Sequence, residues 1–503
     1  MRASGGFVAI ALSTVALAGC LGPTETVDPL TIPSLPVALQ NPALQCIQTL
    51  CNFLATVDPV TRQANELSIA VNPTDPRNIV ATGKDYTPEY AGDCVWDGLY
   101  VTKDGGATWK NSNLPGSPWK RLRDPAEPVT EFSSFWCVTD PVLAFGPDGT
   151  LYWTVMPYQC DAASGSKTGR GVFPQVPGTF FGGGLNDWAF TCSAMYVLVS
   201  EDGGETWPIV REVAFGPLLM HDKQWIAASP DGKTVLLCWD WNLAYVVHAE
   251  MVCSVSKDKG RSWSDYASVN PNYDGYYPFM DFDSDGIAYM AFQDRSSIYV
   301  ARSADGLSWE APTRVGAHKM PPPGGEHGRS VLANSEFRVA AMPQLAVDRS
   351  VGPHGGNVYV TWFDHSSGFG RTLFARSTDG GQTFSEPVIV RDLPEDHPSD
   401  QFFPAISVGP DGVVDLSWHD RRDDPANYVY DLYYAYSRDG GLTWSANLRV
   451  TEVSSDERFS RHQNGMVFLG DYRASASSAG AAHLVWTDTR NGKADVFVAT
   501  VER

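Results

Sequence analysis

The sequence carries little charge and lacks a cysteine pattern typical of a metal or redox site. Only 19% of its 503 residues are charged, and the net charge is −21. This acidic balance disfavours nucleic acid and anionic lipid surfaces as partners, because both are themselves negative. An anionic ligand would therefore need a local basic pocket. None of the nine cysteines stands in a Cys-x-x-Cys or Cys/His cluster, which argues against zinc or redox chemistry.

The apolar run near the start of the chain is too short to span a bilayer. It covers Phe7 to Ala18 and follows Arg2, which is typical of a secretory signal. The Leu-Ala-Gly-Cys sequence that ends at Cys20 resembles a lipobox and implies cleavage before Cys20 and acylation of its thiol. The alternative is an ordinary secretory signal with a chance cysteine at this position.

Three regions follow from this reading: a lipoprotein signal peptide at residues 1–19, a tether at 20–45 and a folded body at 46–503. The tether is predicted because residues 21–45 hold five prolines and no periodic pattern. We expect an exported lipoprotein, periplasmic or at the cell surface, that meets the membrane only through its lipid anchor.

With Cys20 acylated, eight cysteines remain, an even number that suits disulfides in an oxidising compartment. Cys46 with Cys51 and Cys238 with Cys253 are plausible pairs. The pairing of the other four stays open: Cys94, Cys137, Cys160 and Cys192.

An octet of the form Ser/Thr-x-Asp-x-Gly-x-Thr/Ser-Trp recurs along the chain. Its clearest copy runs from Ser437 to Trp444, and the others are Thr102 to Trp109, Ser200 to Trp207, Ser256 to Trp263, Ser377 to Phe384 and the shorter Ser303 to Trp309. The Asp can accept hydrogen bonds from backbone N–H groups further along, and Gly supplies the positive φ of a tight hairpin. We interpret the octet as a structural turn whose closing Trp begins a new strand.

Each octet ends a longer unit of strands joined by hairpin turns. Similar units start near Leu67, Pro141, Gln224, Pro278, Pro343, Phe403 and Tyr472. Because four-stranded units cannot bury both faces alone, they are expected to pack radially around a channel. The predicted fold is all-β, a single β-propeller of seven four-stranded blades, with six blades and an appended hairpin as the alternative. A strand from within residues 47–62 should complete the last blade.

The octets and units resemble the Asp-box, or bacterial neuraminidase repeat, propellers of the sialidase superfamily, over roughly residues 60–503. The resemblance implies an exo-α-sialidase type of glycoside hydrolase, with three arginines on the sugar carboxylate, a Tyr nucleophile activated by Glu, and an Asp acid. The Phe/Tyr-Arg-Ile-Pro motif that supplies the first arginine in that family is absent. Glu66, Tyr472 and Tyr434 are candidates for the Glu and Tyr roles.

Two rings of residues are expected on the channel-mouth face, opposite the octets. The first lies where the inner strands begin and contains Glu66, Asp140, Lys223, Tyr277, Met342, Phe403 and Asp471, with Asp222 adjacent. Glu66, Asp140, Asp222, Asp471 and Tyr472 are the candidate catalytic residues. Carboxylates and a lysine around a narrow mouth would perturb one another's pKa values. The alternative is a water-filled rim of solvated charges.

The second ring lies where the second strands end. Its members are Asp294, Arg295, Asp364, Asp420, Arg421, Arg422, Asp488 and Arg490. Either they tie neighbouring blades together as Asp–Arg bridges, or arginines among them bind a carboxylate through their bidentate guanidinium groups. As ligand-binding candidates we name Arg295, Asp420, Arg421, Arg422, Asp488 and Arg490.

One stretch resembles half of a calcium loop. Asp281, Asp283 and Asp285, followed by Gly286, match the start of an Asp-x-Asp-x-Asp-Gly pattern, but the twelfth position is Phe292, which cannot ligate. The other units place a plain hairpin turn here. No other cofactor is expected.

Long connections rich in Gly, Pro and aromatic residues, at 111–139, 157–193 and 311–340, should also stand on the channel-mouth face and shape a binding cleft. Two functions therefore remain: a sialidase-like glycan hydrolase, or a non-catalytic propeller that binds a glycan or a surface protein.

Overall fold

The computed structural model describes residues 30–31, 45–47, 50–55, 63–86, 95–121, 124–160, 192–217, 219–243, 247–269, 275–324, 329–460 and 467–503. The predicted signal peptide, Cys20 and nearly all of the predicted tether lie outside these residues. Within them, no helix is long and apolar enough to cross a membrane.

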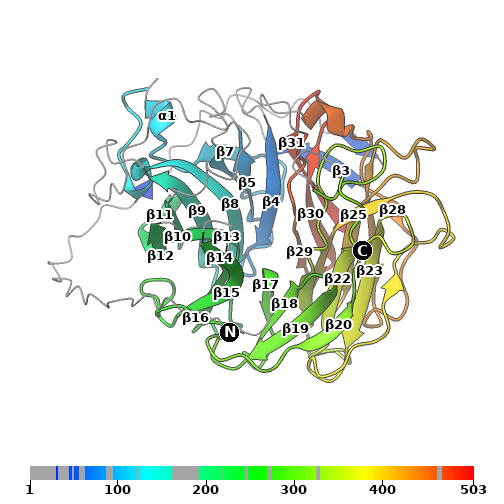
Figure 1. Ribbon diagram of the computed structural model, residues 1–503. Helices are drawn as coiled ribbons and strands as arrows, with labels where there is room; N and C mark the ends of the chain where they lie inside the picture. Colours follow the sequence, from blue (N-terminus) through cyan, green and yellow to red (C-terminus); the bar gives the residue numbers. More distant parts are fainter. Residues whose placement is uncertain are drawn as a thin grey trace, which may run out of the picture.

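Seven antiparallel sheets are arranged radially, as the repeats predict (Figure 1). The first strand of each sheet contacts the first strand of the next, and β29 contacts β4, so these strands surround the central axis. The sheets are, in order, β4 (Ala64–Val71), β5 (Ile79–Asp85), β6 (Trp96–Thr102) and β7 (Lys110–Asn113); β8 (Phe135–Phe145), β9 (Leu151–Cys160), β10 (Cys192–Ser200) and β12 (Ile209–Pro217); β13 (Leu219–Ala228), β14 (Val235–Leu243), β15 (Val247–Ser256) and β16 (Ala267–Ser268); β17 (Tyr276–Phe282), β18 (Ala288–Gln293), β19 (Ser297–Ser303) and β20 (Thr313–Ala317); β21 (Gln344–Val347), β22 (Val358–Asp364), β23 (Arg371–Ser377) and β24 (Val388–Ile389); β25 (Gln401–Val408), β26 (Val414–Asp420), β27 (Asp431–Ser437) and β28 (Leu448–Arg449); and β29 (Ser475–Ser478), β30 (Ala481–Asp488) and β31 (Asp495–Glu502) with β3 (Leu50–Leu54) and β2 (Gln45–Ile47).

Few other elements are present in the described part of the chain. They are the strand pair β1 (Leu30–Thr31) and β11 (Thr206–Trp207), the short helix α1 (Pro118–Arg121), and the 3-10 helices Glu131–Ser134 and Glu457–Ser460. Each blade buries its apolar side chains against the next. Trp153, Trp207, Trp239, Trp362, Trp418 and Trp486 are all fully buried.

The ring closes as expected, because the chain's N-terminal part completes the last blade. In β3, Asn52 pairs with Ala499 and Leu54 with Phe497 of β31. The Asn52 side chain also donates to Val450 O at 3.0 Å. In Figure 1 the blue first sheet and the red last sheet lie beside each other at this junction. Closure removes the open edge that an incomplete blade would leave.

The octets form the predicted turns. In the copy ending at Trp444, Ser437 Oγ donates to Asp439 Oδ1 at 2.8 Å, and Gly441 N donates to Ser437 Oγ at 2.8 Å. Thr443 donates to Asp439 through its N–H at 2.9 Å and through its hydroxyl at 2.5 Å. Gly440 and Gly441 have φ of 67° and 80°. The octet Asp is thus held by its own turn, which supports the structural interpretation.

The prediction that the closing Trp begins the fourth strand is wrong for this copy. Strand β28 begins only at Leu448. Trp444 instead packs against Phe374 of the preceding blade, with ring centroids 5.0 Å apart. The large aromatic side chain gains more by filling the gap between two blades than by extending one sheet.

The disulfide predicted between Cys238 and Cys253 is present and links β14 to β15. Cys137 and Cys192 are each part of a disulfide as well. Cys46 and Cys51 are opposite each other in the β2–β3 hairpin, but their side chains lie outside the described part of the structure.

Deleting residues 46–62 should lower the melting temperature of the whole protein as one transition. The deletion removes the outer strands of the last blade. The ring then no longer closes, which destabilises all blades together instead of unfolding one end locally. Calorimetry would measure this, and a truncated protein that kept its melting temperature would refute the closure.

Stability should also fall in acid because of the octet carboxylates. Slight burial would raise the pKa of Asp439, but hydrogen bonds from Thr443 and Ser437 lower it to about 2, below the usual 3.8 of an Asp carboxyl. A lowered folded-state pKa contributes stability above about pH 4 that is lost as the pH falls toward 2. Asp439→Asn should lower the melting temperature at pH 7 and show a smaller drop than wild type between pH 5 and pH 2. An equal drop in both proteins would contradict this.

Candidate functional site

Six of the residues predicted for the first ring share one unusual backbone conformation. Glu66, Asp140, Lys223, Tyr277, Met342 and Phe403 all have positive φ, between 21° and 64°. In five blades the pairing of the first two strands shifts register at this residue, so it forms a β-bulge. In the seventh unit Gly470 has the positive φ and Asp471 follows it. The repeated bulge places these residues at one level of the ring.

The charged members of this ring form one buried cluster. Lys223 Nζ lies 3.0 Å from Glu66 Oε1, 2.7 Å from Asp140 Oδ2 and 3.0 Å from Asp471 Oδ2. Lys84, at the end of β5, pairs with Glu66 and lies 3.1 Å from Asp140 Oδ1. All of these side chains are buried. The cluster therefore joins the first, second, third and seventh blades across the channel.

Arg338 completes the cluster from the connection between the fourth and fifth blades. Its guanidinium binds both carboxylate oxygens of Asp471 and lies over the Phe468 ring, 4.7 Å from the centroid. A bidentate pair of this kind is a strong, directional contact. Each carboxylate in the centre of the cluster is thus held by at least one cation of the protein.

The cluster separates the pKa values of its two central carboxyl groups. Burial, with the nearby Asp140 charge, raises the pKa of Glu66 to about 7. Burial would also raise that of Asp140, but Lys223 and Lys84 hold the pKa of Asp140 well below its usual range. The Glu66 and Asp140 carboxyl groups are bridged by Lys84 and Lys223, each of which binds both of them. Near neutral pH, Glu66 is therefore the group that carries a proton beside an ionised Asp140.

The other half of the same ring is apolar. Tyr277 and Met342 are half-buried and Phe403 is buried. Beside them, Trp225 stacks on Phe279 with ring centroids 3.8 Å apart. Tyr277, Met342, Trp225 and Phe279 line a cavity of about 20 Å³. That volume has room for a water molecule but not for a sugar ring.

Tyr472 lines this cavity, next to the charged cluster. Lys223 Nζ lies 5.5 Å from the centroid of its ring. The Tyr472 hydroxyl is buried without a hydrogen-bond partner among the described residues. Burial, with the Asp140 and Glu66 charges, raises the pKa of Tyr472 well above its usual value. Burial likewise raises the pKa of the adjacent Asp222 to about 6.

In the second ring, Arg421 is fully buried and bound on several sides. It pairs with Glu457 at 2.9 Å and donates to Ser335 Oγ at 2.7 Å and Asn427 O at 3.1 Å. Asp400 Oδ2 lies 3.8 Å away. Arg421 therefore ties the end of β26 to the connections on either side of it.

Arg422 and Arg490 each pair with the Asp two residues earlier and with a second acidic side chain. Arg422 is 2.7 Å from Asp420 and 2.6 Å from Asp392, and its guanidinium lies over the Tyr433 ring. Arg490 binds Asp488 at 2.7 Å, Glu452 at 3.3 Å and the closing-strand Asn52 at 2.9 Å.

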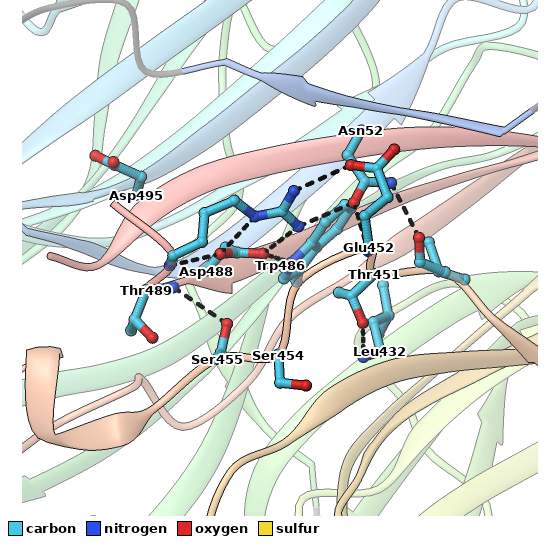
Figure 2. Close-up of polar contacts among 12 residues, drawn as sticks. Asn52, Leu432, Thr451, Glu452, Ser454, Ser455, Trp486, Asp488, Thr489 and Asp495 are labelled. Carbon is cyan, nitrogen blue, oxygen red and sulfur yellow. Dashed lines mark hydrogen bonds and ion pairs between the residues drawn. The ribbon is translucent and has the colours of Figure 1, made fainter. Parts of the chain in front are cut away.

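Figure 2 shows the surroundings of Asp488, with Asn52 and Glu452 close by. Trp486 Nε1 donates to Asp488 Oδ2 at 2.8 Å, and Thr489 N donates to Ser455 Oγ at 3.1 Å. In the sixth and seventh blades, the Asp at the end of the second strand, Asp420 or Asp488, thus fixes both the buried Trp and the following Arg.

Other predicted residues are engaged in local contacts. Asp294 Oδ1 accepts from Ser296 N and Ser297 N, and Arg295 beside it is exposed. Asp364 Oδ1 accepts from Lys319 N at 2.7 Å.

In the stretch that resembles half a calcium loop, Asp283 accepts from Asp285 N and Ile287 N, as a hairpin turn would require. Asp281 pairs with Arg349 of the next blade at 2.6 Å. Over the described residues, no group of three or more His, Cys, Asp or Glu side chains is placed to hold a metal. The calcium site remains a prediction.

Sequence reasoning missed Lys84, Arg338 and Asp97. Lys84 and Asp97 occupy the ends of β5 and β6 in the first blade, and burial raises the pKa of Asp97 well above its usual value. These positions do not recur from blade to blade, so no repeat pattern marks them. The Glu66–Lys84 pair depends on the register between β4 and β5, which only the folded sheet shows.

Arg421→Ala should destabilise the fold by about 3–5 kcal/mol, because removing one partner of a buried ion pair leaves the other charge uncompensated. This is more than the ~1 kcal/mol at most that an exposed pair would contribute. Denaturant unfolding measures the change. Arg458→Ala, which breaks the exposed pair with Asp456 nearby, is the control and should have a far smaller effect. Equal effects of the two substitutions would contradict the role given to Arg421.

Known proteins resemble this chain in its repeats and in its fold. Residues 435–446 match the family model described as BNR/Asp-box repeat. No curated protein sequence matches the chain. A Hadza microbial sialidase aligns with 84% of this chain and 76% of its own at 14% identity, with a TM-score of 0.43. The α-L-arabinofuranosidase of Fusarium graminearum aligns with 90% of this chain and 97% of its own at 13% identity, with a TM-score of 0.46.

A sialidase of Trypanosoma rangeli aligns with 76% of this chain and 56% of its own at 13% identity, with a TM-score of 0.42. Similarities this low carry no argument about activity. On its own strand topology and its repeats, the chain is a seven-bladed β-propeller with Asp-box turns.

Proposed function

We propose that this chain is an exported, lipid-anchored propeller that recognises a glycan at its channel mouth on the cell surface. The observation that carries the proposal is the two-sided ring of bulge residues. Glu66, Asp140 and Lys223 make one half charged and buried, and Tyr277 and Met342 make the other half apolar and half-buried. A sugar has hydroxyl edges and a C–H face, so it matches a wall that is polar on one side and aromatic on the other. The sequence's resemblance to sialidase-superfamily propellers supports the same ligand class.

The geometry favours binding over hydrolysis. Most glycosidases separate their two carboxyl groups by about 5–9.5 Å to leave room for the scissile bond or a water. Glu66 and Asp140 instead both bind the ammonium groups of Lys84 and Lys223, which occupy the space between the two carboxyl groups. No glycosidic bond fits between them.

Of the two tyrosine candidates, Tyr434 donates to Asp415 Oδ1 at 2.6 Å, but that carboxylate is itself bound by Arg503. Tyr472 lacks an activating partner in the described part of the chain. A Tyr nucleophile needs a base within hydrogen-bond reach, and the Tyr472 hydroxyl has no such partner there. Arg421, Arg422 and Arg490 are already bound by protein carboxylates. Their ligand-binding role stays a prediction.

Glycoside hydrolysis is the second candidate, and one observation favours it. Glu66, with a pKa of about 7, lies beside an ionised Asp140. Environments that push two carboxyl pKa values apart are typical of an acid/base pair. The two candidates differ in whether Glu66 is needed for turnover.

The first experiment uses residues 46–503 produced as a protein with its disulfides formed. It measures fluorophore release from an α-sialoside and binding to a panel of immobilised glycans. We expect no turnover, and binding that Tyr277→Ala weakens by about tenfold or more, since aromatic stacking would be lost. Tyr266→Ala is the matched control, because Tyr266 is exposed and lies away from the channel bulges.

Two other outcomes would favour a different function. Turnover that is lost in Glu66→Gln and Tyr472→Phe would establish the hydrolase. Absence of both turnover and glycan binding from a well-folded sample would overturn the proposal and leave a scaffold that binds a surface protein.

A further inference from the structure

Part of the connection between the fourth and fifth blades lies across the channel mouth. Residues 329–340, which we call the strap, leave their own blades and contact the sixth and seventh. Asn334 donates to Ala426 O at 3.2 Å, in the connection between the second and third strands of the sixth blade. Arg338 binds Asp471 of the seventh unit, 133 residues further along the chain. The strap therefore bridges blades that are not its neighbours in sequence.

The strap places an aromatic side chain on the apolar half of the ring. Phe337 is fully buried, and its ring centroid lies 5.2 Å from that of Phe402 and 5.8 Å from that of Phe403. Phe403 is one of the bulge residues. Leu332 is buried in the same apolar cluster, whereas residues 333–336 are exposed or half-buried. One side of the strap thus faces the ring and the other faces solvent.

The next residue of the strap places a cation on the charged half of the ring. Arg338 binds both carboxylate oxygens of Asp471, which in turn lies 3.0 Å from Lys223 Nζ. The Arg338 charge also acts on Glu66 and Tyr277. Two consecutive strap residues therefore match the two halves of the ring, one aromatic and one charged.

Side chains, more than backbone pairing, hold the strap in place. Glu457 accepts from Glu336 N at 2.8 Å and from Arg421 at 2.9 Å, and Arg421 donates to Ser335 Oγ at 2.7 Å. Within the described residues, the strap forms only isolated bridges inside its own connection and joins no blade's sheet. A segment held by so few backbone hydrogen bonds opens at a lower cost than a strand inside a blade.

The ring has no room for a sugar while the strap is in this position. The cavity beside Tyr277 and Met342 has a volume of about 20 Å³, enough for water alone. Glu66 and Asp140 are buried, so neither is accessible to a ligand from solvent. A glycan can reach the ring only after the strap has moved.

We propose that the strap is an autoinhibitory lid, whose Phe337 and Arg338 occupy the channel mouth until the strap moves off the ring and a glycan takes their place. That the ligand is a glycan rests on the proposed function, whereas the opening of the strap rests on its own contacts. The lid deepens the proposed function, because it adds control of access to the same site.

A lid makes the apparent affinity depend on the open fraction. A ligand that binds only the open state has an apparent Kd equal to its intrinsic Kd divided by that fraction. Removing a strap contact raises the open fraction and should tighten binding. Removing a residue that touches the glycan would weaken binding, so the sign of the change distinguishes a lid from a ligand contact.

The test uses the full chain with its disulfides formed and two variants of the strap. Arg338→Gln removes the ion pair with Asp471, and Phe337→Ala removes the buried ring but leaves that pair intact. Arg302→Gln is the matched control. Arg302 pairs with Glu310 at 2.6 Å beside an Asp-box turn, and its side chain is 34% exposed against 29% for Arg338.

Two readouts are compared across these proteins: amide hydrogen exchange of peptides that cover residues 329–340, followed by mass spectrometry, and binding to the panel of immobilised glycans. In wild type the strap amides should exchange faster than those of β22. Both strap variants should exchange about tenfold faster still in the strap, which corresponds to losing one charge-assisted hydrogen bond in Arg338→Gln. Exchange in β22 should not change.

Glycan binding should tighten by about threefold or more in both strap variants and stay unchanged in Arg302→Gln. Melting temperatures verify that each variant folds. Because Phe337→Ala keeps the charged cluster complete, agreement between the two variants excludes an effect of the unpaired Asp471 carboxylate.

The remaining outcomes separate the lid from the proposed function. If the strap variants exchange faster while no protein binds a glycan, the lid stands and glycan recognition fails. If strap exchange is the same in both variants as in wild type, the lid is overturned, even where glycans bind. Faster exchange with glycan binding that is unchanged or weaker would overturn the control of access.

Discussion

Pairing of β3 with β31 is the contact on which the rest of the structure depends. A propeller has a channel, and a channel mouth, only when its last blade meets its first. Here that junction is made by backbone hydrogen bonds between segments more than 400 residues apart, and it is supported by Asn52, whose side chain reaches Val450 and Arg490. Because every blade packs on two neighbours, loss of this junction would expose apolar faces on both sides.

Ring closure also decides the electrostatics of the centre. The bulges in five of the inner strands place one side chain each at the same level of the ring, and the closed ring brings Glu66, Asp140 and Asp471 into direct contact with Lys223. Buried charges persist only when they are paired and hydrogen-bonded. The cluster satisfies that condition with two lysines and Arg338, and one consequence is a carboxyl group, Glu66, that titrates near neutral pH. The same neutralisation removes the open space that a two-carboxylate hydrolase needs.

Arginines of this protein divide into two groups by their surroundings. Arg421, Arg422 and Arg490 are held by carboxylates close by in the fold, so their charges serve the packing of strand ends against neighbouring connections. Arg371 and Arg391 have only neutral acceptors or none in the described part of the chain. Carboxylates act on both of these arginines only from a longer distance, Asp400 and Asp420 on Arg371 and Asp420 and Asp392 on Arg391.

The sequence by itself determined the architecture. The repeated octets, the hairpin turns and the spacing of the units predict seven blades, closure by a strand from residues 47–62, and a Cys238–Cys253 disulfide, because turn chemistry and strand periodicity are local properties. Alignment of the units also places the bulge residues at one level, since one position recurs in each blade. Tertiary structure alone decided which side chains meet. Lys84, Arg338 and Arg391 belong to strand ends and connections that do not repeat, and the contacts of Arg421 span segments up to 88 residues apart. Whether a charge is neutralised depends on distances across the ring, and those exist only once the ring has closed.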